Sequence, residues 1–197
     1  MSDNLSYDLA IVGGGLAGLA LSIQIAKSGH SVLVFEKEQY PFHRVCGEYI
    51  SLESWNFLQS LGIDLKELNV SSIKRLHVSA VNGRFFEQEL ALGGFGISRY
   101  LLDSTLAKIA KQAGVTIQEQ ERVNEIKFSD SFSTIGTSKG NYKARVVVGC
   151  FGKRSNLDIK WKRPFIIAKK NKLNNYIGVK YHIRYNFLLD TIALHNF

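Results

Sequence analysis

The stretch that decides the fold runs from Tyr7 to Glu36 and holds Gly13-Gly14-Gly15-Leu16-Ala17-Gly18 between two apolar runs. Residues 7–12, before the glycines, are short and mostly apolar, as in a buried parallel strand. Behind the glycines, apolar residues recur at helical spacing until Ser28-Gly29 supplies a helix stop. Residues 31–35 then restore a β-branched strand. This order predicts a βαβ unit of the dinucleotide-binding kind.

Three glycines of the motif each have a physical reason. Gly13 lets the chain turn sharply off the strand, Gly15 has no Cβ to block a pyrophosphate, and Gly18 lets helix and strand pack closely. The helix start presents N–H groups and a positive dipole end to phosphates. Glu36 stands 23 positions beyond Gly13, where a carboxylate accepts hydrogen bonds from both ribose hydroxyls of an adenosine. A 2′-phosphate there would be repelled, which argues against NADP in this pocket.

The composition is that of an ordinary globular protein. Of the 197 residues, 45% are hydrophobic and 21% charged, enough for a sizeable core. No basic region precedes the first apolar run, so we expect no cleaved signal peptide, and glycines interrupt the longest apolar window. Cys46 and Cys150 are the only cysteines and lie far apart in the sequence, which argues against a zinc site or a disulfide framework. A cytoplasmic location is the resulting expectation.

Positive charge gathers at the carboxyl-terminal end. Residues 1–152 hold 15 Lys and Arg against 15 Asp and Glu, whereas residues 153–197 hold 10 against 2. Such a segment is a solvated face or one that meets an anionic ligand or a lipid surface, so peripheral membrane contact is one expectation. A nucleic-acid partner is not expected, because no recognised binding module accompanies the charge.

The remaining sequence predicts a strand-built part inside the α/β scaffold. A helical run over residues 52–61 precedes a hairpin over residues 73–91, whose Asn82-Gly83 turn would place both residues at positive φ. Periodicity also predicts a helix over 100–113 and strands over 115–117, 123–128, 132–137 and 142–149, the last returning into the buried sheet. A further alternating strand is expected over 177–185, with Ile177, Val179, Tyr181, Ile183 and Tyr185 on its packed face.

Four segments together resemble one known family. They are the glycine motif, the loop from Phe42 to Glu48, the segment from Ile97 to Asp103 and the segment from Gly149 to Ser155. In this order they resemble FAD-dependent oxidoreductases of the geranylgeranyl reductase-like branch, which is similar to the p-hydroxybenzoate hydroxylase-type superfamily. The resemblance covers residues 5 to about 155. It implies an α/β fold, a Rossmann-like FAD-binding domain with an inserted or following antiparallel β substrate subdomain.

The resemblance also implies where FAD is held. Arg44 lies where a guanidinium pairs with the pyrophosphate, and Cys46-Gly47 matches the position over the isoalloxazine ring. A plain buried thiol is the equal alternative for Cys46. Arg99 matches the arginine that reaches the phosphates or the ribityl chain, and Val123 the position whose backbone meets the adenine. The expected cofactor contacts are Gly13, Gly14, Gly15, Leu16, Ala17, Gly18, Glu36, Lys37, Arg44, Cys46, Gly47, Arg99, Val123 and Gly152.

No metal ligand and no catalytic acid or base can be assigned. His43 and Glu48 flank Cys46 and are expected to be hydrogen-bonding loop residues rather than proton carriers.

Two departures from the family bear on activity. Phe151-Gly152 replaces the usual Asp-Gly after the returning strand, which removes a carboxylate near the phosphates and weakens the expectation of hydride entry from NADPH. The chain also stops at Phe197, before a later Gly-Asp motif and most of the substrate-covering sheet. We therefore expect an amino-terminal portion of a longer enzyme. Residues 1–155 would form the FAD-binding domain, with a hairpin insertion at about 73–91, and residues 156–197 the start of the substrate-domain sheet.

The expected function is flavin-mediated reduction or monooxygenation of an apolar, isoprenoid-like small molecule, with NADPH or NADH as the electron donor. A halogenase is disfavoured because the Trp-x-Trp-x-Ile-Pro signature is absent. The alternative is a non-catalytic FAD- or NAD-binding module that needs a further segment or a partner chain. An NAD-only dehydrogenase would leave Arg44 and Arg99 without a role. The sequence does not indicate an oligomeric state.

Overall fold

The computed structural model describes residues 6–153, 155–167, 177–184, 186 and 190–195. Contacts between residues group the chain into a first unit, Met1–Phe42 with Asp103–Ile177, and a second unit, His43–Leu102 with Gly178–Phe197. The expected domains, 1–155 and 156–197, are functional divisions and stay a prediction. Tyr185 of the predicted strand lies outside the described residues. So do four of the basic residues counted over 153–197: Arg154, Lys169, Lys170 and Lys172.

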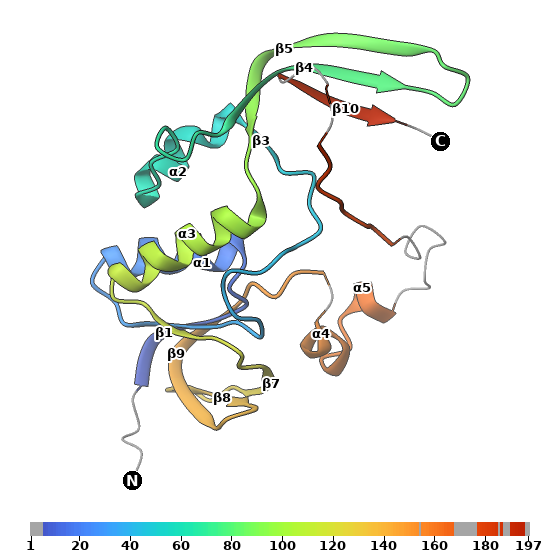
Figure 1. Cartoon of the computed structure of the whole chain (residues 1–197). Coiled ribbons are helices and arrows are strands. Elements are labelled where there is room, and N and C mark those ends of the chain that lie inside the picture. Colours follow the sequence, from blue (N-terminus) through green and yellow to red (C-terminus); the bar gives the residue numbers. More distant parts are fainter. Residues whose placement is uncertain (1–5, 154, 168–176, 185, 187–189, 196–197) are drawn as a thin grey trace. The chain divides into compact units, whose positions relative to one another are not determined.

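The first unit is built on a six-stranded sheet in the order β6-β2-β1-β9-β8-β7 (Figure 1). Four strands run parallel: β1 (Ser6–Val12), β2 (Val32–Phe35), β6 (Thr116–Gln118) and β9 (Asn141–Gly149). From β9 the sheet continues antiparallel through β8 (Ser133–Thr137) and β7 (Val123–Lys127). The predicted Rossmann-like α/β fold is confirmed, as is the return of the 142–149 strand beside β1.

Two longer helices accompany this sheet. Helix α1 (Leu16–Lys27) connects β1 to β2 and packs on both, and it ends before Gly29, whose φ of 86° is the left-handed conformation of a helix stop. Helix α3 (Arg99–Gln112) enters the first unit at Asp103 and buries Leu106 and Ala110. Two short helices follow β9, α4 (Asn156–Lys160) and α5 (Pro164–Ile167).

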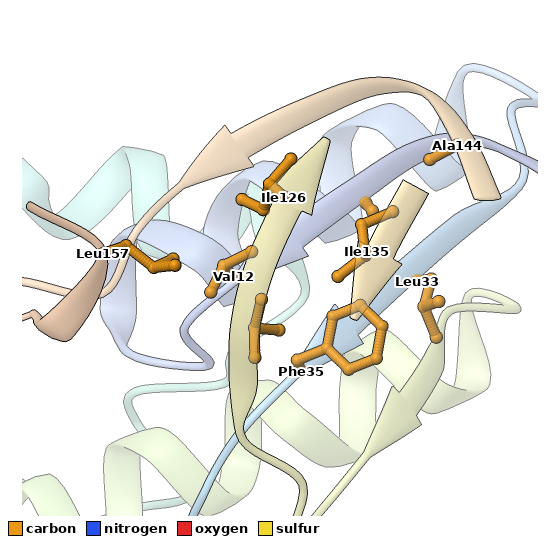
Figure 2. Packing of buried hydrophobic residues seen from close by; sticks show 9 residues of the cluster. Val12, Leu33, Phe35, Ile126, Ile135, Ala144 and Leu157 are labelled. Atoms are coloured by element: carbon orange, nitrogen blue, oxygen red, sulfur yellow. The ribbon is translucent and has the colours of Figure 1, made fainter. Parts of the chain in front are cut away.

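The core of the first unit covers both faces of β1 and β2. On one face, Val12, Leu33 and Phe35 pack with Ile126 of β7 and Ile135 of β8 (Figure 2). On the other face, the alternate residues of both strands are also buried, as are Leu19 and Ile23 of α1. Each such side chain contributes about 1.5–3 kcal/mol on burial. This two-sided burial explains why both strands read as continuous apolar runs.

The second unit is centred on a four-stranded sheet in the order β10-β4-β5-β3. The hairpin of β4 (Ser71–Ser79) and β5 (Phe85–Gly96) carries β3 (Tyr49–Ser51) antiparallel on one edge and β10 (Thr191–His195) parallel on the other. Between β3 and β4 lie the 3-10 helix η1 (Leu52–Ser54) and α2 (Trp55–Leu61). The expected second, strand-built part is therefore present.

Two expectations for the second part of the chain were wrong in detail. Asn82 is not among the described residues with positive φ, whereas Gly83 has a φ of 79°. The Gly83 N–H donates to the Ala80 carbonyl and the Ala80 N–H to the Arg84 carbonyl, at 3.0 and 2.8 Å. The loop thus has three residues, a type I turn closed by a glycine bulge, in place of the expected two-residue turn.

The strand expected over residues 177–185 is the second correction. Residues 177–184 form neither helix nor strand, and the side chains of Ile177, Tyr181 and Ile183 are 87%, 81% and 80% exposed. Period-two alternation specifies a half-buried strand only if a neighbouring strand pairs with it, and the described sheets pair other segments. The strand that the structure does form, Thr191–His195, was not anticipated.

No helix in the described part of the chain is both long and apolar enough to cross a membrane.

Candidate functional site

The turn from β1 to α1 admits glycine alone at two of its positions. Gly13 has a φ of 111°, and a Cβ there would come within 3.0 Å of the Cys150 carbonyl at the end of β9. A Cβ on Gly18 would come equally close to the Gly13 carbonyl. The Gly13 N–H donates to the Phe35 carbonyl at 2.9 Å, which ties the turn to β2. The close packing of helix and strand that the sequence predicts at Gly18 is thus realised.

The amino-terminal end of α1 has the properties of an anion site. Gly15 is its N-cap and has no side chain to cap the helix, and no acidic residue lies in the first turn. Leu16, Ala17 and Gly18 occupy this turn, where N–H groups have no acceptor within the helix. Uncapped N–H groups and the helix dipole together favour a phosphate.

Glu36 is 3% exposed and turns its carboxylate toward this glycine turn. Its Oε2 atom accepts a hydrogen bond from the Gly14 N–H and its Oε1 atom one from the Glu38 N–H, both at 3.1 Å. A carboxylate has about four acceptor positions, so these two backbone donors do not by themselves saturate it.

Tyr40 belongs to this cluster and was not predicted. Its hydroxyl donates to the Gly14 carbonyl, and a Cβ on Gly14 would collide with the same hydroxyl. The Tyr40 N–H donates to Glu119 Oε2 at 2.8 Å, and Lys111 pairs with the other oxygen of Glu119 at 2.6 Å. In the sequence Tyr40 is one aromatic residue in a polar loop, and no spacing rule connects it with Gly14.

The chain leading into β7 runs beside Glu36. The Glu36 N–H donates to the Gln118 carbonyl, and the Glu121 N–H donates to the Glu36 carbonyl, at 2.9 and 3.0 Å. Val123 follows two residues later, buried by the core. The structure therefore brings the segment expected to meet the adenine next to the carboxylate expected to bind the ribose.

The end of β9 meets the glycine turn. The Cys150 N–H donates to the Val12 carbonyl at 2.8 Å, and burial raises the pKa of the Cys150 thiol. Phe151, where the resemblance led us to expect an aspartate, packs near Trp161 with ring centroids 6.3 Å apart. Gly152 has a φ of 73° and open space on its Cβ side. The substitution at Phe151 thus replaces a charge near the turn with an apolar contact.

Four predicted contacts lie in the second unit, on a loop and a helix start that are adjacent there. The His43 ring stacks on Tyr100 with centroids 4.6 Å apart, and the Ile97 N–H donates to the Glu48 carbonyl at 3.0 Å. These contacts bring the loop that carries Arg44, Cys46 and Gly47 beside the start of α3, where Arg99 lies; Arg44 and Arg99 are half-buried.

Gly47 has no reason within the chain to be glycine. A Cβ placed there would meet nothing within 4 Å, and its φ lies outside the left-handed range. Gly13 and Gly18, in contrast, are required by neighbouring backbone. A glycine without an internal cause, on an exposed loop, leaves room for close approach from outside.

The predicted contacts divide between the two units. The first unit brings together the glycine turn, Glu36, the segment leading to Val123 and the Gly152 segment. Lys37 is exposed, and its Nζ atom lies 3.9 Å from Glu38 Oε1. Arg44, Cys46, Gly47 and Arg99 form the group in the second unit. A pocket of about 500 Å³ in the first unit, beside Tyr40, Pro41 and α3, contains none of the predicted contacts.

Comparison with known proteins agrees with this geometry. The family model of an NAD(P)-binding Rossmann-like domain matches residues 11–46. Conditioned medium factor receptor 1 of Dictyostelium discoideum is 28% identical over 78% of this chain and 35% of its own length. Kynurenine 3-monooxygenase of Christiangramia forsetii is 28% identical over 88% of this chain and 41% of its own length. Digeranylgeranylglycerophospholipid reductase 1 of Methanococcoides burtonii is 33% identical over 59% of this chain and 29% of its own length.

Solved structures show the same fold. The halogenase PltM, in a complex with phloroglucinol and FAD, has a TM-score of 0.66 and 20% identity, covering 79% of this chain and 36% of its own. The chain spans less than half the length of these relatives. The chain therefore contains an NAD(P)-binding Rossmann-like domain, is similar in sequence to a kynurenine 3-monooxygenase and a digeranylgeranylglycerophospholipid reductase, and has the fold of the FAD-containing PltM structure.

Proposed function

We propose that this chain binds FAD and forms the nucleotide-binding part of a flavin-dependent oxidoreductase. The observation that carries the proposal is the β1–α1 turn. Gly13 and Gly18 there admit no side chain, the helix start is uncapped, and the Glu36 carboxylate points at the same turn. These features fit a diphosphate and a ribose, the parts shared by FAD and NAD.

Two further features favour FAD over NAD. The loop with Arg44 and Gly47 and the helix start with Arg99 have no role for NAD alone, and the complex of PltM contains FAD. When bound, the flavin would supply hydride and electron transfer. In the proposed arrangement, Glu36 binds the ribose, the first turn of α1 the pyrophosphate, and the Cys46-Gly47 backbone the ring system.

The reaction class is the finer part of the proposal. We infer reduction or monooxygenation of an apolar small molecule, with NADPH or NADH as electron donor. The kynurenine monooxygenase and geranylgeranyl reductase relatives support these two chemistries. The halogenase PltM is only 20% identical to this chain, so the similarity supports a shared fold and not a halogenation reaction.

A second candidate is a nucleotide-binding module without activity of its own. It is favoured by the β1–α1 turn, whose geometry fits a nucleotide and assigns no reaction. The module would bind FAD as tightly as the first candidate does, but would not turn over.

The absorbance spectrum of purified protein, reconstituted with FAD and desalted, tests both candidates. Retained flavin absorbance is expected, and bleaching by NADPH or NADH under anaerobic conditions would separate an oxidoreductase from a module. Glu36→Gln should weaken FAD binding by about 1–3 kcal/mol, the range for hydrogen bonds to a charged group. Glu125→Gln, at an exposed position of β7, is the matched control and should leave affinity unchanged. Colourless protein after reconstitution, or an unaltered Glu36→Gln affinity, would overturn the proposal.

A further inference from the structure

Glu48 holds a backbone conformation that favours glycine. Its φ is 60°, in the left-handed region, and it stands between Gly47 and the first residue of β3. A non-glycine residue pays a conformational cost there and persists only where its surroundings hold it in place. Such outliers concentrate at functional sites, so the contacts that hold Glu48 are informative.

The backbone of Glu48 is held on both sides. Its N–H donates to the Cys46 Sγ atom at 3.5 Å, and its carbonyl accepts the Ile97 N–H at 3.0 Å. One residue therefore fixes the loop carrying Cys46 and Gly47 to the chain just before α3. Gly47 and Glu48 also line a pocket of about 370 Å³, together with Ile97, Ser98 and residues of β10.

The carboxylate of Glu48 reaches a distant part of the sequence. Its Oε1 atom pairs with the Lys180 ammonium, and its Oε2 atom lies 3.5 Å from His182 Nε2. The side chains of Glu48 and Lys180 are only 22% and 18% exposed. A pair this shielded is screened less than a surface ion pair, and it is a charge-assisted hydrogen bond.

Residues 178–184 are mostly exposed. The side chains of Val179, Tyr181 and Ile183 are largely exposed, so apolar burial does not anchor them. Within the described second unit they contact the 43–48 loop through the two pairs to Glu48, the His182 ring near His43, and Gly178 beside Val45. The ion pair is thus one of the attachments between these two segments.

We propose that Glu48 is a positioning residue that fastens residues 178–184 to the Cys46-Gly47 loop and thereby fixes the open face of Gly47. The consequence for a bound ring rests on the proposed function. The fastening itself does not, because it is a property of the second unit alone.

Hydrogen exchange measured by mass spectrometry tests the fastening. Glu48→Gln should speed exchange about tenfold in peptides from both 43–48 and 178–184, since one charge-assisted hydrogen bond is lost. Peptides from β1 and α1 should not change. Lys180→Met should speed exchange in the same two peptides by no more than Glu48→Gln does, and the double variant should show no change beyond Glu48→Gln, because Glu48→Gln already removes the pair with Lys180. Glu53→Gln, exposed on η1, is the matched control.

The outcomes decide the fastening and the positioning role separately. Unchanged exchange, or additive effects of Glu48→Gln and Lys180→Met, would overturn the fastening. If Glu48→Gln unfolds globally, Glu48→Asn gives the decision, since asparagine tolerates the left-handed backbone and lacks the charge. With FAD bound, the visible circular dichroism of the flavin should change in Glu48→Gln while affinity falls less than threefold; an unchanged spectrum would overturn the positioning role. Wild-type protein that binds no FAD would refute the proposed function and leave the exchange result to decide the fastening.

Discussion

Gly13 and Gly18 are required by neighbouring backbone, whereas Gly47 is not, and substitution by alanine distinguishes the two cases. Gly13→Ala and Gly18→Ala place a Cβ against backbone carbonyls that cannot move aside, so each should lower the free energy of unfolding by at least about 2 kcal/mol. Gly47→Ala meets open space and should change stability by less than about 0.5 kcal/mol. Urea unfolding measures all three. If the backbone of Gly47 meets a ring, Gly47→Ala should nonetheless weaken FAD binding in a titration. A destabilised Gly47→Ala, or one with full affinity, would contradict this division.

Asp8 makes the stability of the first unit depend on pH. The Ser31 backbone N–H, at 2.9 Å from Asp8 Oδ2, and then the Ser31 hydroxyl lower the pKa of Asp8 below its usual value of 3.8. A lowered folded pKa means that the contribution is fully present above the unfolded pKa, about 3.9, and is lost as pH falls through the folded pKa.

Asp8→Asn should therefore be less stable than wild type at pH 6. The difference should persist to about pH 5 and close below about pH 4, as the wild-type carboxylate takes up its proton. Denaturation midpoints across this range provide the measurement. Ser31→Ala is the partner control, since it removes one of the two donors and should show a smaller gap that closes in the same range. A gap that widens on acidification would show the opposite linkage.

At the scale of single residues, the sequence predicted what backbone geometry enforces. Gly13, Gly18 and Glu36 were identified because a sharp turn, a close helix and a carboxylate at a fixed spacing are local requirements. Tyr40 was missed because its partner, the Gly14 carbonyl, lies 26 positions away and involves no pattern. Lys180 lies within the strand that was expected over 177–185, whereas the structure pairs it with Glu48.

At the scale of elements, the turn of the β4–β5 hairpin gives a decisive substitution. In the observed three-residue loop, Val81 is the second residue of a type I turn, a position that favours proline, and Ala80 supplies the closing N–H. Val81→Pro should therefore raise the free energy of unfolding by about 0.4–1 kcal/mol. In the two-residue turn expected from Asn82-Gly83, Val81 would donate to the ladder, and proline would destabilise it. Urea unfolding of Val81→Pro distinguishes the two turns, with Val81→Ala as the control for the lost side chain.

The elements that were predicted correctly share one property: their apolar side chains are buried against an adjacent element of the fold. β1 and β2 bury both faces in the first unit, β9 pairs with β1 and β8, and α1 has its stop at Gly29. The pattern over 177–185 is as regular, yet no described strand pairs with residues 177–184. Alternation reports which residues would share a face, and pairing depends on a partner that local sequence does not specify.

At the scale of the whole molecule, the order of the motifs along the chain predicted more of the fold than any single motif did. The glycine turn alone predicted the first unit, and a hairpin signal in the middle of the chain predicted a second sheet. The parallel addition of β10 to β4 joins residues more than a hundred positions apart. Such pairing is set by long-range packing, so the composition of the second unit from two separate stretches was beyond local reasoning.

Ligand linkage gives the prediction for the entire chain. FAD at 100 times its Kd should raise the free energy of unfolding by about 2.7 kcal/mol, because ligand bound only to the folded state stabilises by mass action. If Glu36→Gln weakens binding tenfold, the same concentration should give that variant only about 1.4 kcal/mol. FMN carries the ring without the adenylate, and NADP carries a 2′-phosphate that Glu36 would repel. Both should stabilise far less than FAD in the same denaturation experiment. Equal stabilisation by FMN would place the binding energy on the ring rather than on the β1–α1 turn, and would remove the physical basis for the role of Glu36.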